Sequence, residues 1–428
     1  MASLERLLAD KFLRSDPDEG SGRMRPAVRL TVAGIALGVS VVLLSFFIVQ
    51  AFKEEIRTKV NGLIGSLVIS NPDNVYGQYT IPLSLPSDAL QAISQTVKEY
   101  EARASLFTFA DEMALLKTDS AFAGILMHGV DSLYNSSFFG SYLLEGRLPE
   151  FRADTLQTEI LISEYLSGRL SLGVGDEVMA YFTSNDETGK PDGGVKMRRL
   201  RVSGIINTGF ESFDQKMILG DVRLVRNVRG WDEGQVSGVM VQLPGGVPAE
   251  PVYESLFSLL SDRYAGAGER YAMNRAEELS GGLLQWLDLL DANVVLILFL
   301  LTAVAGMTMI TGIIVLVLEK VKAIATLKAL GQGNRSLKGV FRQMALSILL
   351  RGLLWGNVVA LVLAAVQILW HPLTLDASQY YMNYVPMKID LPSLLWVNVA
   401  IFVAIYLLVL IPVILISKVR PSEALRFE

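Results

Sequence analysis

The sequence predicts an α-helical membrane protein with four transmembrane helices and a large α+β domain inserted between the first helix and the second. About half of the 428 residues are hydrophobic (51%), and the mean hydropathy is positive, which is typical of membrane proteins and unusual for soluble ones. Four apolar runs contain no charged residue, at 30–51, 294–318, 352–370 and 394–416. Since about 20 apolar residues in a helix span the core of a bilayer, each run is long enough to cross a membrane.

Positive charges predict the orientation of these helices. The loop at 319–342 contains six Lys or Arg and one acidic residue, and the segments 1–29 and 417–428 are also basic. The loop at 371–393 contains one Lys and two Asp. Because positively charged loops stay in the cytoplasm, both ends of the chain and the 319–342 loop are predicted to be cytoplasmic. The segment 53–292 and the 371–393 loop are then predicted to lie outside.

The outer segment 53–292 is acidic and contains no cysteine. It carries 33 Asp or Glu and 21 Lys or Arg, a net charge of −12 against −5 for the whole chain. This charge argues against nucleic acid as a partner. Without cysteine there are no disulfides, so the domain must fold on its hydrophobic core alone, and its 240 residues are enough for that.

The first apolar run predicts an uncleaved transmembrane helix at 30–52. At 22 residues the run is longer than the apolar part of a signal peptide, and no small-residue cleavage site follows it. It contains Gly34 and Gly38, a small-xxx-small spacing that lets a second helix approach closely. The charged residues at 53–57 predict that the helix continues outward as a stalk.

Strand and helix patterns alternate along the outer domain. Strands are predicted at 66–70, 106–116, 124–130, 158–162, 177–182, 198–207 and 237–243. Helices are predicted at 87–100, 163–170 and 251–264. The segment 279–293 predicts a helix that runs into the second transmembrane helix at 293–318.

The polar, glycine-rich segment Thr183–Met197 lies between two of these strands. One interpretation is a long β-hairpin that projects from the body of the domain. The other interpretation is a disordered surface loop. The residues alone leave both open.

A helix-forming stretch, Leu318–Gly331, follows the second span. Ile324, Leu327 and Leu330 repeat every three residues, which predicts a short amphipathic helix, and Gly331 is suited to end it as a C-cap. One interpretation is a helix that docks in a groove on a soluble partner and transmits force into two membrane helices. The alternative is a basic connector that lies on the lipid headgroups.

The third and fourth spans, predicted at 343–370 and 394–416, contain the polar residues Asn357, Gln367 and Asn398. We expect these side chains to form interhelical hydrogen bonds rather than a transport path, because polar side chains commonly bridge helices in membranes.

The sequence shows no catalytic or metal-binding constellation. It has two histidines, His128 and His371, far apart in the chain, and no cysteine, so no metal cluster of the usual spacing is predicted. It lacks the G-x-x-x-x-G-K-[ST] motif of a P-loop. We therefore predict no enzymatic activity and no cofactor in this chain. Energy for any work must come from a partner, and a cytoplasmic ATPase binding at 319–331 is the obvious candidate.

Several stretches carry a resemblance to a known family. They are residues 32–52, the outer-domain stretches Glu145–Arg147, Ile160–Ser163 and Leu172–Asp176, the stretch from Glu319-Lys320 through Ile324-Ala325 to Leu327–Gly331, and the tail Arg420–Glu428. They are similar to motifs of the FtsX/MacB-type ABC permeases and, within these, of the LolC/LolE group. The order of one span, a large outer domain and three more spans resembles the same family.

The resemblance implies a permease subunit in the bacterial inner membrane with its large domain in the periplasm. Such a subunit pairs with a second permease subunit, identical or different, and with two copies of a LolD-like cytoplasmic ATPase that holds ATP and magnesium. Members of this group extract lipoproteins from the inner membrane and pass them to a LolA-like periplasmic carrier, which a hairpin hook on the outer domain grips.

The sequence pattern and the resemblance together assign residues to these partners. The group expected to couple to the ATPase is Glu319, Lys320, Ile324, Leu327, Lys328, Leu330 and Gly331. The hook that the resemblance implies contains Thr183, Asp186, Pro191, Met197 and Arg199. The apolar outer ends of spans one and two, expected to contact acyl chains, contain Phe47, Val49, Val294 and Leu298.

Two other classes of function stay open. A permease with the same architecture can serve MacB-like efflux or FtsX-like control of cell-wall hydrolases. A membrane receptor that needs no ATPase is the third class. Charge reversal at Lys320 and Lys328 separates them, because it should uncouple an ABC permease and leave a receptor intact.

Overall fold

The computed structural model describes residues 26–76, 80–151, 156–185, 191–245, 247–264, 271–280, 282–319, 321–376, 380 and 382–415. The chain divides into two compact units. The helical unit comprises Met1–Phe52, Asp288–Leu373 and Val385–Glu428, and the α/β unit comprises Lys53–Leu287 and Thr374–Tyr384. Of the predicted terminal segments 1–29 and 417–428, residues 1–25 and all of 417–428 lie outside the described residues.

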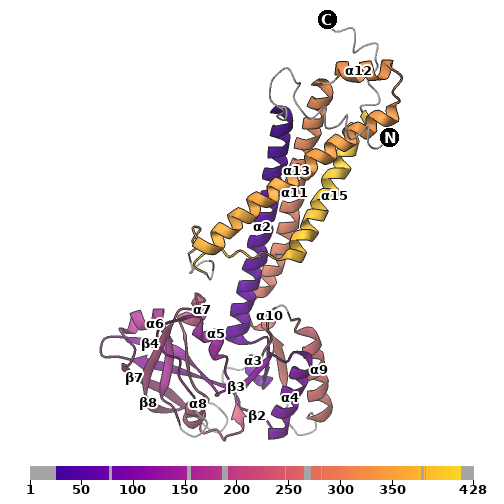
Figure 1. Cartoon of the computed structure of the whole chain (residues 1–428). Helices are drawn as coiled ribbons and strands as arrows, with labels where there is room; N and C mark the ends of the chain where they lie inside the picture. Colours follow the sequence, from indigo (N-terminus) through magenta and orange to yellow (C-terminus); the bar gives the residue numbers. More distant parts are fainter. Residues whose placement is uncertain are drawn as a thin grey trace. The chain divides into compact units, whose positions relative to one another are not determined.

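Four long helices build the helical unit. They are α2 (Pro26–Ile64), α11 (Leu283–Glu319), α13 (Asn334–Trp370) and α15 (Leu391–Leu415). Each is long and apolar enough to cross a membrane, and α2 and α11 extend past the helical unit into residues of the α/β unit. The short helix α12 (Val321–Ala329) follows α11. In Figure 1 helices α2, α11 and α15 run in similar directions and α13 crosses them obliquely.

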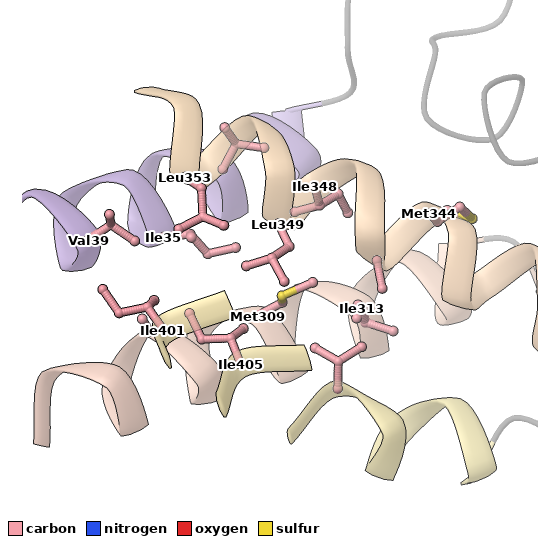
Figure 2. Packing of buried hydrophobic residues seen from close by; sticks show 14 of the residues in the cluster. Ile35, Val39, Met309, Ile313, Met344, Ile348, Leu349, Leu353, Ile401 and Ile405 are labelled. Atoms are coloured by element: carbon pink, nitrogen blue, oxygen red, sulfur yellow. The ribbon is translucent and has the colours of Figure 1, made fainter. Parts of the chain in front are cut away.

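One apolar cluster holds these helices together. Figure 2 shows Ile35 and Val39 of α2, Met309 and Ile313 of α11, Met344, Ile348, Leu349 and Leu353 of α13, and Ile401 and Ile405 of α15 converging on it. The cluster contains residues from all four helices and Ile324 from α12. In a bilayer such packing, rather than escape from water, stabilises the association of helices.

Glycines set how closely the helices approach. A Cβ atom added at Gly34 would lie 2.7 Å from Thr308 Cγ2 of α11, and one at Gly38 would lie 3.1 Å from Ala305 Cβ. The small-xxx-small pair therefore faces α11. A second pair, Gly352 and Gly356 of α13, lies against Ile35 and Val39 of α2 in the same way. This second pair has the same spacing in the sequence but was not recognised from it.

The polar residues of the spans form hydrogen bonds in two different ways. Asn357 of α13 and Asn398 of α15 exchange side-chain hydrogen bonds of 2.7 and 2.9 Å, as predicted. Gln367 instead donates to the backbone carbonyls of Leu373 and Val385, both at 3.0 Å. The difference arises because Gln367 lies in the last turn of α13, which ends at His371 in the left-handed conformation, so backbone groups of the following loop are within its reach.

A ten-stranded sheet forms the centre of the α/β unit. Its order is β12-β1-β11-β3-β4-β9-β6-β8-β5, and β7 pairs with both β3 and β8. The strands are β1 (Leu67–Ser70), β3 (Ser105–Lys117), β4 (Phe122–Val130), β5 (Leu143–Gly146), β6 (Glu159–Ser163), β7 (Glu177–Asn185), β8 (Pro191–Ile206), β9 (Met217–Asp221), β11 (Gly238–Gln242) and β12 (Ala272–Arg275). A separate two-stranded sheet pairs β2 (Leu83–Ser84) with β10 (Gln235–Val236).

Helices cover both faces of the sheet. The helices of this unit are α3 (Asp73–Tyr76), α4 (Ser87–Tyr100), α5 (Ser136–Gly140), α6 (Glu164–Leu170), α7 (Glu211–Asp214), α8 (Val222–Arg229), α9 (Glu250–Arg263) and α10 (Ala276–Leu279). Buried residues of α6 and α8 share one apolar cluster with strands, and those of α4 and α9 share a second. A third cluster contains Phe107 and Phe109 of β3 together with residues of α5, α7 and the end of α2.

Candidate functional site

Helix α12 holds the candidate ATPase-coupling residues. Ile324 is completely buried in the apolar cluster of the helical unit, and Leu327 packs against that cluster while partly exposed. Leu330, by contrast, is 80% exposed. A step of three residues falls short of a full turn of 3.6, so two steps rotate a side chain by about 120° around the axis. The predicted short amphipathic helix is present in α12, but Leu330 follows its last residue, Ala329: Ile324 anchors α12 and Leu330 points away from the cluster.

Gly331 ends this segment with a defined backbone motif. Its φ is +91°, its N–H donates to Lys328 O at 3.0 Å, and the N–H of Gln332 donates to Leu327 O at 3.0 Å. These two bonds form a Schellman motif, in which the left-handed residue is usually glycine. The predicted C-cap is thus present. Helix α13 begins three residues later, so Leu330 stands at a tight, exposed corner.

The charged members of the coupling group have separate positions. Glu319 is exposed at the end of α11, and Lys328 is half-buried on α12. Lys320 lies outside the described residues. Thr326, four residues before Leu330, and Arg335, five residues after it, are exposed as well. The corner therefore combines one large apolar side chain with polar and basic groups.

Strands β7 and β8 place the candidate hook residues on an antiparallel hairpin. Their register runs from Glu177 opposite Arg201 to Thr183 opposite Val195 and Asn185 opposite Pro191. Strand β7 also pairs with β3, but only as far as Phe182 opposite Ala114. The described residues beyond Phe182 therefore pair only within the hairpin. Asp186 lies outside the described residues.

One face of the sheet beside this hairpin is apolar and exposed. Residues directly opposite each other in paired strands share a face, and Leu115, Tyr181 and Met197 are paired in this way across β3, β7 and β8. Five large apolar side chains on this face are exposed, and we call them the apolar sheet face: Met113 (64%), Leu115 (39%), Phe122 (67%), Val195 (63%) and Met197 (56%). The opposite face holds the buried Ala114, Ala180, Phe182 and Leu200.

Short helices cover one part of this side of the sheet and leave the apolar sheet face exposed. Phe107 and Phe109 lie on the same side of β3, since residues two apart in a strand share a face, and both are buried with residues of α5 and α7. Large exposed apolar patches usually mark interaction sites. Arg199 lies at the edge of the patch, 71% exposed, with Nη1 3.4 Å from Glu177 Oε2.

The residues expected to contact acyl chains are largely buried rather than exposed. Phe47 is 1% exposed and belongs to the apolar cluster of the helical unit. Its position eight residues after Val39 and four after Leu43 puts it on the inner face of α2. Leu298 is partly buried against the same cluster, and Val49 and Val294 are half-buried. In this structure Phe47 serves packing between helices.

Sequence reasoning missed a buried polar cluster at the end of α2. Lys59 Nζ donates to Thr208 O at 2.7 Å and lies 5.2 Å from the centroid of the Tyr142 ring. Thr208 Oγ1 donates to Asp214 Oδ1 at 2.9 Å, and burial raises the pKa of Asp214 and of Tyr142. The spacing of Lys59 from Ile56 and Leu63 places it on an apolar stripe, and this signal could have revealed it.

Within the described part of the chain, no group of three or more His, Asp or Glu is arranged to hold a metal ion. The two histidines have ordinary surroundings. His128 Nδ1 lies 2.6 Å from Asp111 Oδ1, inside the sheet, and His371 ends α13.

Comparison with known proteins gives matches over most of the chain. Residues 29–257 match the model of the MacB-like periplasmic core domain, and residues 293–421 match that of the FtsX-like permease C-terminal region. The lipoprotein-releasing system transmembrane protein LolC of Neisseria meningitidis serogroup B is 22% identical over 439 residues, with full coverage of both chains. The LolC protein of Xylella fastidiosa (strain 9a5c) is 22% identical over 93% of each chain. The resemblance predicted from the sequence is confirmed.

Solved structures give weaker matches. The periplasmic region of MacB from Actinobacillus actinomycetemcomitans is 13% identical with a TM-score of 0.34, covering 51% of this chain and 92% of that one. The extracellular domain of the noncanonic ABC-type transporter YknZ from Gram-positive bacteria is 15% identical with a TM-score of 0.32, covering 49% and 97%.

Proposed function

Because the chain belongs to the family with a MacB-like periplasmic core domain and an FtsX-like permease region, and is thus a permease subunit of an ABC transporter, we propose that its cargo is lipoproteins. The transporter would extract them from the bacterial inner membrane and pass them to a periplasmic carrier. The observation that carries this proposal is the end-to-end match to proteins named as LolC of lipoprotein-releasing systems.

The proposed topology follows from the charges and the four apolar helices. Helices α2, α11, α13 and α15 cross the inner membrane, the acidic α/β unit lies in the periplasm, and the basic α12 segment lies in the cytoplasm. The large domain is thereby inserted between the first span and the second. A second permease subunit, a copy of this chain or a related one, completes the pair.

We place the contact with a LolD-like ATPase at the corner around Leu330. Leu330 is exposed on one side of α12, whereas Ile324 fixes the other side to the apolar cluster of four helices. A displacement of Leu330 by the ATPase would therefore be transmitted to the membrane helices through α12, which is packed against them. ATP and magnesium belong to the ATPase, since the sequence of this chain has no P-loop.

We place the contact with a LolA-like carrier at the apolar sheet face and the hairpin. The hairpin tip segment is rich in Asp, Glu and Gly, which offers little apolar surface for a partner. The neighbouring strands supply that surface through Met113, Leu115 and Phe122. A carrier gripped here would rest on the sheet as well as on the hairpin.

Depletion of the chain in its native host tests the proposal. Membranes separated on a density gradient should show outer-membrane lipoproteins accumulating in the inner membrane, and the parent chain should restore normal sorting. A Leu330→Asp variant should fail to do so although it inserts normally, while Leu133→Asp, at another exposed leucine (67%) in the α/β unit, should succeed. Normal lipoprotein sorting after depletion, with altered sensitivity to drugs or peptides, would move the function to MacB-like efflux or FtsX-like regulation.

A further inference from the structure

A cavity of about 580 Å³ lies in the α/β unit where the end of α2 meets the start of α11. Its lining consists of Val60, Leu63, Ile64, Phe210, Ser212, Phe213, Met217, Leu279, Ser280, Gly282 and Trp286. The volume falls within the range of about 300–1,000 Å³ that is usual for small-molecule sites. Nothing in the proposed transport cycle so far uses this space.

The chemistry of the walls restricts what the cavity can bind. Eight of the eleven lining residues are large and apolar, two are serines, one is glycine, and none is charged. The hydroxyl of Ser280 already donates to Glu277 O at 3.2 Å. A phosphate, a sugar or a nucleotide would lose its water here without finding enough hydrogen-bond partners. An alkyl chain loses nothing, because burying methylene groups is favourable.

Two of the lining residues lie on helices that contain candidate membrane spans. Val60 follows the charge-free run of α2 by nine residues, and Trp286 precedes that of α11 by eight. At about 1.5 Å per residue, this is roughly 12–14 Å along each helix. Gly282 lies between α10 and α11 with φ +86° and open space around its Cβ position, so that wall is held by a residue with wide backbone freedom.

We propose that this cavity binds a single lipid alkyl chain. Its identification as an acyl chain of the cargo, held outside the bilayer before transfer to the carrier, rests on the proposed function. In that role the apolar walls shield one side of the chain from water after the protein has removed it from the membrane, while Leu279 and Trp286 at the rim remain 43% and 47% exposed.

Photolabelling of the full chain in lipid nanodiscs tests the proposal. The probes are a palmitic acid analogue carrying a diazirine, a phospholipid with the same chain, and a lipopeptide with the same chain on its N-terminal cysteine. Mass spectrometry should find label on the peptides that contain Phe210 to Met217 or Leu279 to Trp286. Absence of label from both peptides with all three probes overturns the proposal.

Variants that fill or charge the cavity test the site, and a variant outside the cavity is the control. Ser212 is exposed on the short helix α7, and Ser212→Trp should reduce labelling of these peptides at least fivefold. Ser120→Trp, in the exposed turn that follows β3 and does not line the cavity, should leave the labelling unchanged. Leu279→Glu, at a partly exposed wall position, should act like Ser212→Trp. Equal labelling of all variants overturns the proposal, and a melting curve for each shows that it is folded.

The arms of the experiment separate this inference from the proposed function. Labelling needs neither ATPase nor carrier, so a chain that labels in the cavity but does not release lipoproteins refutes the function and keeps the site. A chain that releases lipoproteins without label in the cavity refutes the site and keeps the function. Label from the phospholipid but not from the lipopeptide overturns the assignment to the cargo.

Discussion

Helix α12 and the β7–β8 hairpin both bury one side and expose the other, but they differ in how much surface each offers. On α12 one completely buried side chain, Ile324, is opposed by one exposed leucine at the corner. The hairpin strands instead expose part of the broad apolar sheet face, to which β3 and β4 also contribute. The first arrangement suits the transmission of a displacement through a small contact, and the second suits the binding of a large partner.

The two regions also differ in what lies behind them. Behind Ile324 is a cluster shared by four long helices, so a displaced α12 must move them or lose its packing. Behind the hairpin is a strand network in which β8 pairs with β5, β6 and β7. A sheet paired on several sides resists displacement, so the hairpin is expected to hold a partner rather than to move with it.

The largest effect is expected from loss of the α12 anchor. Ile324→Ala removes a completely buried side chain, which typically costs about 2–5 kcal/mol, and it leaves α12 free to move without the spans. We expect lipoprotein release to fall at least tenfold, while binding of the ATPase falls much less. Release by reconstituted transporter and co-purification of the ATPase measure the two effects.

Leu327→Ala is the matched control for this prediction, because that leucine is only partly buried against the same cluster. It should give a clearly smaller loss of release. Equal losses for the two variants would contradict the view that Ile324 alone fixes α12.

The next effect concerns the hairpin. Val195→Ser combined with Met197→Ser removes two exposed side chains of the apolar sheet face, so we expect the free energy of unfolding to change by about 0.5 kcal/mol or less per site. Affinity for the purified carrier should fall roughly tenfold, about 1.4 kcal/mol, as measured by calorimetry. Leu133→Ser, at an exposed leucine away from this face, is the control, and an equal loss there would refute the assignment.

The sequence was sufficient to predict most helices and strands. It did not predict which side of each element is buried and which is exposed for binding. The charge-free runs predicted the four long helices, because a bilayer demands length and apolar composition in one continuous segment. The segment from Met217 to Arg229 was missed. Strand β9 is short and includes Gly220, so it lacks the expected alternation, whereas α8 has buried Val222, Val225 and Val228 beside Arg223, Arg226 and Arg229 at helical spacing and could have been recognised. Tertiary pairing of β9 with β4 decides the structure of that strand.

The candidate sites show the same limit. A repeat inferred from spacing alone does not show where a short helix ends: Ile324 and Leu330 belong to one repeat in the sequence, but α12 ends at Ala329 and Leu330 is exposed in the following turn. The apolar sheet face joins Met113 and Phe122 to Met197, which is distant from both in the chain and meets them only through the register of β3, β4, β7 and β8. Such a patch follows from strand order, which a single sequence does not specify.

A smaller effect is expected at the end of α12. Gly331→Ala forces a side chain into the left-handed conformation at φ +91°, which costs about 1–2 kcal/mol and weakens the Schellman motif. We expect a two- to fivefold loss of ATPase-driven release with normal membrane insertion. Gly333→Ala is the control, since Gly333 has φ −72° and open space around its Cβ position. Equal losses for the two would show that the conformation at Gly331 is not the cause.

The smallest effect is expected at the edge of the hairpin, and it separates binding from stability. Arg199 and Glu177 form an exposed ion pair at 3.4 Å, and such pairs contribute about 0–1 kcal/mol. Arg199→Gln should therefore leave thermal unfolding nearly unchanged. Arg229→Gln breaks the buried ion pair with Glu112 and should cost about 3–5 kcal/mol, because a carboxylate stays buried without its partner. If Arg199→Gln nevertheless weakens carrier binding at low salt and not at high salt, Arg199 acts on the partner through its charge. A loss of stability as large as that of Arg229→Gln would show instead that the edge of the hairpin is part of the folded core.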